Sequence, residues 1–355
     1  MRTALLLCCL ACGVTSIAPL FAVAVGQRTL SLVDESRQRP VVTELWYPTE
    51  EAPTAAESQG FGPFVRTPTR REGAICAGRH PLVLVSHGTG GGRLTLEWMA
   101  AGLAERGYVV AAVDHWGNTY DNVVPEYFVK AWERPQDLSF ALTQLLRDPR
   151  VGPSIDPDRV FAIGFSLGGY SVLALAGASM DLDALYRFSE TEEGRRESRI
   201  PEFPQLFDFM HEPATREKLF SEFRRSPSVR DMRIKAAVAL APALGQAFTH
   251  PAQFDPARPP VLILAAEVDQ IAPVKTNAAH YHQLMPGSTF ELLRGDVGHF
   301  VFLNEANADL QERMPGLFKD APSCDRRAVH ERVLQLASSF FARHAVGRAD
   351  PPTPR

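Results

Sequence analysis

The sequence predicts an α/β fold with an open, mostly parallel central sheet flanked by helices. Five short runs rich in Val, Ile, Leu and Ala support this prediction: PLVLVSHG, YVVAAVDH, RVFAIGFS, IKAAVALAP and PVLILAAEVD. Nearly continuous apolar runs of this length are typical of strands that are buried on both faces of a parallel sheet. Strands that alternate with helices indicate right-handed crossovers within one sheet.

The helices are predicted from the same kind of periodicity. Apolar residues recur at helical spacing in four stretches between the strands and in an amphipathic stretch near the end of the chain: 94–106, 134–147, 167–178, 274–285 and about 325–344. The last of these helices is expected to pack on one face of the sheet.

The segment 179–233 interrupts this rhythm. It is charged and aromatic, with helical pieces but no strand. Insertions between sheet elements commonly cover the mouth of a site, where loops carry recognition. We therefore expect a helical cap here. The alternative is a solvated helical excursion that does not contact substrate.

Length and charge indicate a globular protein and argue against a nucleic acid partner. The chain has 355 residues, of which 45% are hydrophobic and 22% charged, which is enough for one large core or two modest ones. Its 37 Lys and Arg nearly balance 41 Asp and Glu, with no long basic run to neutralise a phosphate backbone. We expect one large domain over 25–345 and a flexible tail over 346–355.

The N-terminal residues predict an export signal. MRTALLLCCLACGVTSIAPLFAVAVG carries a basic Arg2, an apolar stretch at 4–14 and then small residues. This order is typical of a secretory signal peptide, and the apolar stretch is too short for a membrane span. We expect residues 1–24 to be removed and the protein to be periplasmic or extracellular, with no stable membrane span afterwards. An uncleaved N-terminal anchor, or a lipoprotein modified at Cys12, is the alternative.

Cysteine usage follows from the expected cleavage. Cys8, Cys9 and Cys12 would leave with the signal peptide, so that the mature chain would keep only Cys76 and Cys324. Two remaining thiols in an oxidising compartment often pair. We predict a disulfide between them, and two unpaired buried cysteines are the alternative.

Ser166 is the candidate nucleophile. It lies in GFSLGG, after the apolar run RVFAI and before LGGYSVLALAGA, a run with helical character. Glycines around a serine permit a strained strand-to-helix turn that exposes the hydroxyl at the end of a strand, and the amides of the following helix point at the site. The alternative is a structural or phosphate-type turn.

A serine nucleophile needs a base, and the base needs an acid that orients it. Asp269 comes just after the predicted strand PVLILAA. The next predicted strand is in FELLRG, and His299 lies on the loop that follows it. The order serine, aspartate, histidine is the one expected of a hydrolase on this kind of sheet. Asp296 and Glu267 are competitors for the acid.

The glycine-rich SHGTGGG, at 86–92, is the candidate oxyanion loop. We expect the amides of Thr89 and Leu167 to bind the oxyanion, and His87 to buttress the loop. A phosphate-binding loop is the alternative, but the lysine and hydroxyl residue that it needs are missing. No metal or other cofactor is expected.

Three aromatic side chains near the ends of strands are further candidates. We expect them to line the substrate pocket, although a structural hydrogen bond is the alternative for the first: His115, Trp116 and Phe300.

Several blocks in the same order resemble one superfamily. They include VSHGTGG, YVVAAVDHWGNT, RPQDLSFALTQLL, DPDRVFAIGFSLGGYSVLALAG, VDQIAP and GHFVFL. The chain resembles the α/β-hydrolase superfamily and, within it, bacterial secreted proteins called predicted dienelactone hydrolases, which are related to platelet-activating factor acetylhydrolases. True dienelactone hydrolases use a cysteine where this chain has Ser166. The resemblance implies a serine esterase that acts on short or oxidised acyl esters without a metal.

Together these patterns predict an exported serine hydrolase of carboxylic esters, which forms an acyl-enzyme on small-molecule esters that are short-chain or lipid-derived. A serine peptidase or an acyltransferase would use the same residues. A non-catalytic binding protein on this fold is a third reading, but it would be expected to have lost a member of the triad, and none is missing.

Overall fold

The computed structural model describes residues 24–58, 62–227 and 229–345. Over these residues the protein forms a sheet of nine strands in the order β11-β10-β9-β8-β4-β5-β2-β1-β3. All five predicted apolar runs form strands of this sheet, and the FELL run forms a sixth: β4 (His80–Ser86), β5 (Val109–Val113), β8 (Ile155–Phe165), β9 (Ile234–Leu240), β10 (Val261–Ala266) and β11 (Thr289–Leu293).

These six strands pair in parallel from β11 across to β5. The sheet then continues with strands that the sequence analysis did not predict. β2 (Arg39–Thr49) pairs antiparallel with β5 and with β1 (Ala24–Asp34), and β3 (Thr69–Arg71) pairs in parallel with β1. The predicted mostly parallel α/β sheet is confirmed, with an antiparallel N-terminal hairpin at one side.

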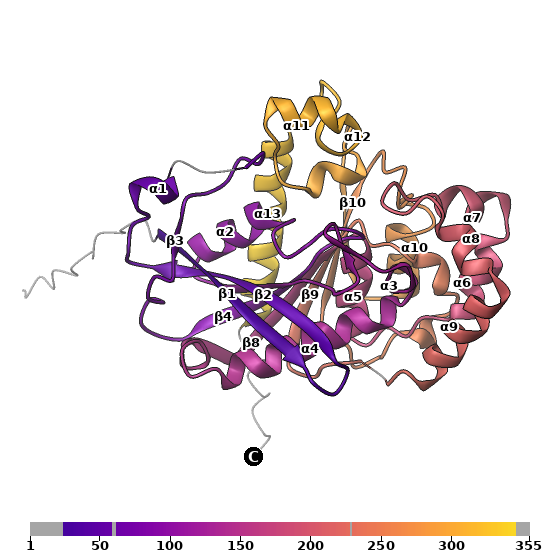
Figure 1. Cartoon of the computed structure of the whole chain (residues 1–355), viewed down its shortest axis with the longest axis horizontal. Coiled ribbons are helices and arrows are strands. Elements are labelled where there is room, and N and C mark those ends of the chain that lie inside the picture. Colours follow the sequence, from indigo (N-terminus) through magenta and orange to yellow (C-terminus); the bar gives the residue numbers. More distant parts are fainter. Residues whose placement is uncertain (1–23, 59–61, 228, 346–355) are drawn as a thin grey trace, which may run out of the picture.

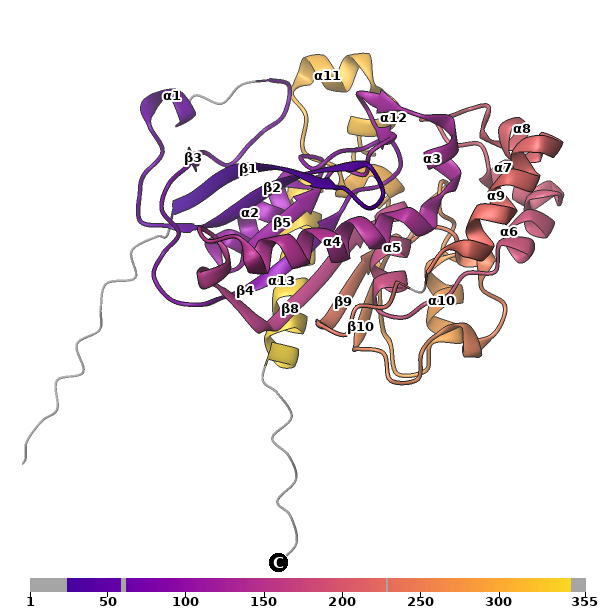
Figure 2. The same ribbon diagram turned by 60° about the horizontal axis from the view of Figure 1, so that its bottom comes forward.

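Helices cover both faces of the sheet (Figures 1 and 2). One apolar core lies between the sheet and three helices, α4 (Arg134–Arg147), α5 (Leu167–Leu175) and α10 (Ala278–Leu284). The other core lies under α2 (Glu97–Glu105) and α13 (Arg326–Ala345). The five predicted helices therefore all exist. α4 has the predicted bounds and α13 lies within one residue of them, whereas α2, α5 and α10 are shorter than predicted.

The insertion at 179–233 contains four helices: α6 (Leu182–Ser189), α7 (Glu192–Glu197), α8 (Leu206–His211) and α9 (Pro213–Arg225). Side chains that bind free backbone amides begin three of them, namely Asp181, Thr191 and Glu212. The insertion forms one flank of the molecule beside α3 and α10 (Figure 1). Its apolar side chains join the core that also contains α4 and α5.

The remaining elements are short and lie in the segments that connect the longer strands and helices. They are α1 (Ala55–Ser58), α3 (Pro125–Val129), α11 (Ala308–Arg313), α12 (Pro315–Phe318), the ribbon β6 (Asn118–Thr119) and β7 (Asn122–Val123), and the 3₁₀ turns η1 (Ala131–Glu133), η2 (Gly152–Ser154), η3 (Gly245–Ala247), η4 (Pro251–Gln253) and η5 (His299–Phe302). The α11–α12 pair was not predicted.

The strand order reverses between β4 and β8. From β4 the chain continues to β5 on one side, and it later returns as β8 on the other side. In an open parallel sheet, such a reversal opens a crevice beyond the carboxyl ends of the two strands, and ligands bind there. The SHGTGGG loop and GFSLGG follow these two strands. The fold therefore brings the two predicted motifs together.

The predicted disulfide is wrong, because Cys76 and Cys324 are both free thiols. The Cys76 amide bonds to the carbonyl of Pro48, at the end of β2 that lies beside the amino end of β5. Cys324 follows Ser323, whose hydroxyl bonds to Asp296 beyond the carboxyl end of β11. Cys76 thus lies at the amino ends of the parallel strands and Cys324 at their carboxyl ends. Strands of five or six residues separate these two ends by about 15 to 20 Å, whereas a disulfide needs Cα atoms within roughly 7 Å.

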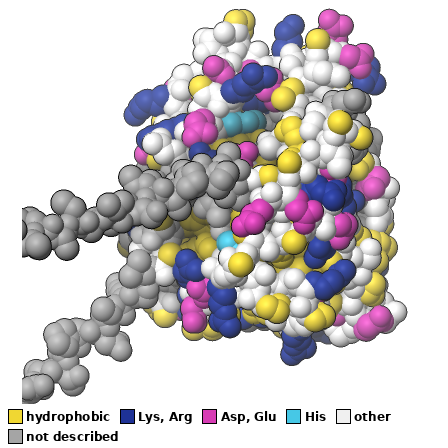
Figure 3. Space-filling view, turned by 90° about the vertical axis from the view of Figure 1, so that its left-hand side faces the viewer, with side chains coloured by type: hydrophobic (Ala, Val, Ile, Leu, Met, Phe, Trp, Pro, Cys, Tyr) yellow, Lys and Arg dark blue, Asp and Glu magenta, His cyan; other side chains and the backbone are white. Residues whose placement is uncertain are grey.

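The predicted signal peptide (1–24) and tail (346–355) lie outside the described residues, apart from Ala24, which begins β1. Within the described part of the chain, no helix is both long enough and apolar enough to cross a bilayer. On the face seen in Figure 3, basic and acidic side chains are interspersed.

Candidate active site

Ser166 occupies a strained turn between β8 and α5. Its backbone has φ 55° and ψ −119°, a region that residues with a side chain seldom adopt. The turn is held from both sides, since the Ser166 amide donates to the carbonyl of Leu240, and the Ser166 carbonyl accepts from the amides of Gly169 and Ala243. Strain of this kind persists only where the surrounding structure fixes it, as at many functional sites.

Two glycines make the close packing of this turn feasible. A Cβ atom at Gly164 would lie 2.1 Å from the carbonyl oxygen of Gly168, and a Cβ atom at Gly168 would lie 2.0 Å from that of Ser86. Neither position has room for a side chain. The glycines of GFSLGG therefore let α5 start directly against the ends of β8 and β4.

His299 connects Ser166 to Asp269. Its Nε2 atom lies 3.0 Å from Ser166 Oγ, and its Nδ1 atom lies 2.6 Å from Asp269 Oδ2. All three side chains are at least nine-tenths buried. Since ionised Asp269 can only accept, Nδ1 carries the hydrogen and Nε2 is free to accept the hydroxyl proton.

The geometry separates the three candidate acids. Asp269 Oδ1 accepts hydrogen bonds from the amides of Ile271 and Ala272, which fix the carboxylate beside the imidazole. Asp296 is exposed and bonds instead to the hydroxyl of Ser323. Glu267 accepts from the amide of Gly295 on the outside of the loop. Asp269 alone among them contacts His299.

The glycine-rich loop lies directly beside Ser166. A Cβ atom at Gly88 would lie 3.2 Å from Ser166 Cβ, so the backbone of the loop passes next to the serine. Within the described residues, neither the Thr89 amide nor the Leu167 amide donates to a backbone or side-chain acceptor. Both residues line the cavity that contains Ser166. Two unused amides beside a serine hydroxyl can receive a developing oxyanion.

Arg134 holds this loop from behind. The guanidinium is buried at 1% exposure and donates to the carbonyl oxygen of His87 and, at 2.9 Å, to Oδ1 of Asn118. The same oxygen of Asn118 accepts from the amide of Gly90. On its other side Arg134 donates to the hydroxyl of Ser171, which donates to the carbonyl of Leu167. One side chain therefore connects the loop after β4 with the first turn of α5.

His87 buttresses the loop, as predicted, and its contacts show that it does so in a neutral form. Its Nδ1 atom lies 2.6 Å from the carbonyl oxygen of Gly88 and donates to it, and its Nε2 atom accepts from the amide of His115. Burial, followed by the nearby charge of Arg134, lowers the pKa of His87 well below its usual range.

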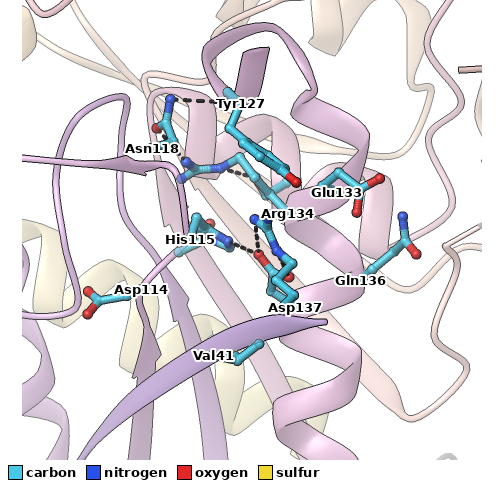
Figure 4. Close-up of polar contacts among 12 residues, drawn as sticks. Val41, Asp114, His115, Asn118, Tyr127, Glu133, Arg134, Gln136 and Asp137 are labelled. Atoms are coloured by element: carbon cyan, nitrogen blue, oxygen red, sulfur yellow. Dashed lines mark hydrogen bonds and ion pairs between the residues drawn. The ribbon is translucent and has the colours of Figure 1, made fainter. Parts of the chain in front are cut away.

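A second Ser-His-Asp arrangement lies deeper in the fold, and Figure 4 shows its histidine and its aspartate, His115 and Asp137. His115 bonds through Nδ1 to Asp137 and through Nε2 to the hydroxyl of Ser86, at 2.9 Å in each case. Asp137 also receives a bidentate pair from Arg39, which helps to lower its pKa. All three members of this buried triad are fully inaccessible, and burial lowers the pKa of His115 to about 3. The buried triad cannot meet a substrate.

The prediction that His115 and Trp116 line the substrate pocket is wrong. Neither His115 nor Trp116 is among the described residues that line the cavity. His115 is fully occupied by Asp137 and Ser86, and Trp116 packs edge-on against Tyr127. Both follow β5, and the amide of His115 donates to His87 of the glycine-rich loop. Phe300, the third prediction, does line the cavity, and its ring packs edge-on against His299.

The serine opens into a cavity of about 970 Å³. The insertion supplies one wall, including Leu185, Phe188 and Ile200, and α11–α12 supply another. Most of the exposed lining surface is apolar, and the polar groups include Ser166, His299 and a few charged side chains. This composition is typical of sites for small molecules, where few polar groups orient a mostly apolar ligand.

No group of three or more His, Cys, Asp or Glu side chains in the described parts of the chain is arranged to hold a metal ion. The roles of Arg134, Asn118 and the α11–α12 segment were not predicted from the sequence. Arg134 lies in the RPQDL block that was quoted for its resemblance, but a helical pattern alone does not tell that a charged residue faces inward.

A strained serine at the switch point of a parallel sheet, with a histidine and an aspartate in contact, defines the class of α/β hydrolases. Comparison with known proteins agrees, because residues 78–312 match the family model described as alpha/beta hydrolase family. The chain belongs to this family.

Many solved structures are similar to this chain, and one of them matches it along nearly its whole length. A ferulic acid esterase from Streptomyces cinnamoneus is similar with a TM-score of 0.59 and 22% sequence identity, over 96% of this chain and 95% of that chain. Among curated protein sequences, none matches this chain. The closer resemblance to predicted dienelactone hydrolases and acetylhydrolases stays a prediction.

Proposed function

We propose that the protein is a serine hydrolase of carboxylic esters. The observation that carries this proposal is the chain of contacts from Ser166 through His299 to Asp269 at the wall of an apolar cavity. A serine hydroxyl attacks a carbonyl group efficiently only when an oriented base takes its proton. The esterase activity in the name of the structural neighbour supports the same reaction class.

In the first half of the reaction, Ser166 Oγ attacks the ester carbonyl while His299 Nε2 takes the hydroxyl proton. The amides of Thr89 and Leu167 bind the tetrahedral oxyanion, and Asp269 stabilises the imidazolium. The carbon–oxygen bond to the alcohol then breaks, and His299 returns the proton to the leaving oxygen. The product is an acyl ester of Ser166.

Water completes the reaction by the same route. His299 takes a proton from a water molecule, whose oxygen attacks the acyl carbon. The second oxyanion is bound by the same two amides, and its collapse breaks the bond to Ser166 Oγ, which regains a proton from His299. A free carboxylic acid leaves, and the enzyme is restored.

The cavity supports small-molecule esters with an apolar acyl or alcohol part, either short-chain or lipid-derived. Its walls are largely Phe, Leu, Ile and Met side chains, which favour apolar groups over a peptide backbone. We also propose that the protein is exported to the periplasm or the medium after removal of its signal peptide. N-terminal sequencing of protein recovered from either compartment tests this cleavage.

A comparison of esters with amides tests the reaction class. Purified protein is assayed with p-nitrophenyl esters of increasing acyl length and with the matching p-nitroanilides. We expect turnover of the esters at rates at least about 10³-fold above those of the anilides, because an amine is a much poorer leaving group. Equal turnover of both series would favour a peptidase, and a folded protein inactive on every ester would contradict the proposal.

A further inference from the structure

Glu202 lies at the mouth of the candidate oxyanion hole. It belongs to the insertion, between α7 and α8, and lines the cavity together with Ser166 and His299. A Cβ atom at Gly90 would lie 3.0 Å from Glu202 Cγ and 3.1 Å from Glu202 Cβ, so this side chain rests against the glycine-rich loop. Burial raises the pKa of Glu202, and the charge of His299, which lines the same cavity, acts to lower it.

The Glu202 carboxyl is unpaired, unlike the other charged groups of the cavity. Glu97 receives two hydrogen bonds of 2.7 Å from Arg66. Glu197 accepts from the hydroxyl of Thr276 at 3.0 Å, and Arg313 pairs with Asp309 on α11. Within the described residues, no group of another residue hydrogen-bonds or forms an ion pair with the carboxyl of Glu202, and its one hydrogen bond is with its own backbone amide.

Glu202 is partly buried. A carboxylate that has lost part of its water and has no cation beside it is destabilised unless a ligand supplies the missing charge. The surroundings of Glu202 suit one kind of cation. Aromatic rings are frequent in the cavity lining: Phe64, Tyr120, Phe128, Phe165, Phe188, Phe300 and Phe318. Aromatic faces attract ammonium groups, and they do so best where water is excluded.

We propose that the cavity selects esters that carry an ammonium group, with Glu202 as the residue that binds the cation. This inference rests on the proposed ester hydrolysis and specifies its substrate class. A carboxylate beside the reacting centre attracts a substrate cation and repels a substrate carboxylate or phosphate. Apolar rings then surround the methyl or methylene groups of the ammonium.

The test compares two esters of the same shape. Butyrylcholine and 3,3-dimethylbutyl butyrate differ in one atom, a charged nitrogen in place of a carbon. The measured quantity is the ratio of their kcat/KM values in one enzyme, so that a general loss of activity cancels. The unsubstituted enzyme should favour the choline ester by about tenfold, and Glu202→Gln should lower this ratio by about the same factor.

Asp208→Asn is the matched control. It removes one negative charge from the same insertion, on an exposed residue of α8 that does not line the cavity. The control should leave the ratio unchanged. An equal change in both variants, or a preference of the unsubstituted enzyme for the neutral ester, would overturn the inference and leave ester hydrolysis standing.

A binding measurement covers the case in which neither aliphatic ester is turned over. Phenyltrimethylammonium should inhibit hydrolysis of p-nitrophenyl butyrate competitively, and Glu202→Gln should weaken this inhibition about tenfold. Unchanged inhibition would refute the role of Glu202. If the folded protein hydrolyses no ester at all, the proposed function fails, and the substrate class fails with it.

Discussion

The guanidinium of Arg134 donates a buried hydrogen bond to the backbone carbonyl of His87, which lies 47 residues away in the chain. The same guanidinium bonds to Ser171, whose hydroxyl holds the carbonyl of Leu167. The two amides proposed to bind the oxyanion belong to segments that Arg134 joins. The distance between these two amides therefore depends on Arg134, which is buried and does not line the cavity.

Arg134→Met should lower kcat by about 10²-fold, with a smaller change in KM. Loss of one oxyanion donor costs about 10²–10³ in kcat in other serine hydrolases, and a displaced loop removes part of one donor. A trifluoromethyl ketone, which forms the oxyanion, should lose affinity by a similar factor, whereas a neutral competitive inhibitor should not.

Ser171→Ala keeps Arg134 in place and provides a milder test if the methionine variant fails to fold. It removes only the link to Leu167, so kcat should fall less than in Arg134→Met while the ketone still binds more weakly. An equal loss of affinity for the ketone and for the neutral inhibitor would indicate general damage to the site rather than a displaced oxyanion hole.

The buried triad should be structural. Ser86→Ala should leave kcat within about threefold and lower the free energy of unfolding by about 1–2 kcal/mol, because it removes a buried hydrogen bond to His115. Esterase assays and urea titrations measure the two effects. A large loss of turnover in folded Ser86→Ala would mean that the wrong serine has been assigned.

Asp269→Asn should lower kcat by about 10⁴-fold, because an amide at this position favours the wrong histidine tautomer. Asp296→Asn should have little effect, since its carboxylate contacts Ser323 on the outside. Steady-state kinetics of both folded variants decide between them. If Asp296→Asn were the more damaging change, the acid would be misassigned.

The protein should lose stability as the pH falls below about 6.5. Burial is the main cause that lowers the pKa of His115 to about 3 and that of His330 to about 4, so both are neutral in the folded state. The unfolded chain binds more protons than the folded one between these values and 6.5. Each imidazole therefore removes up to about 1.4 kcal/mol per pH unit over this interval.

Urea unfolding at pH 7 and pH 5 measures this loss. His330→Gln should reduce the pH dependence, because it removes one of the groups that must stay neutral. A free energy of unfolding that is the same at both pH values would contradict the assignment of buried neutral histidines.

The sequence predicts the parallel strands and the nucleophile turn because their determinants are local. The runs before Ser166 and Asp269 are apolar on both faces, and the glycines around Ser166 have one structural use. The β1–β2 hairpin was not predicted. Buried and exposed residues alternate only in part along β1, so its sequence lacks a clear strand pattern. Its two strands hydrogen-bond fully with each other.

Contacts between distant residues account for most of the remainder. His115 follows a strand and looks like a pocket residue, but its partners Ser86 and Asp137 are 29 and 22 residues away. The thiols of Cys76 and Cys324 looked like a pair by elimination, whereas the sheet separates them. No periodic pattern in the sequence indicates the buried position of His115 or the separation of the two cysteines.

Active-site labelling with a fluorophosphonate tests the central claim most directly. This reagent reacts with serine hydroxyls that an adjacent base activates. Mass spectrometry of the labelled protein should find one adduct, on Ser166, with a proportional loss of esterase activity, and folded Ser166→Ala should take up no label and lose on the order of 10⁶ in kcat. A label on another serine, or ester hydrolysis that survives in Ser166→Ala, would contradict the account.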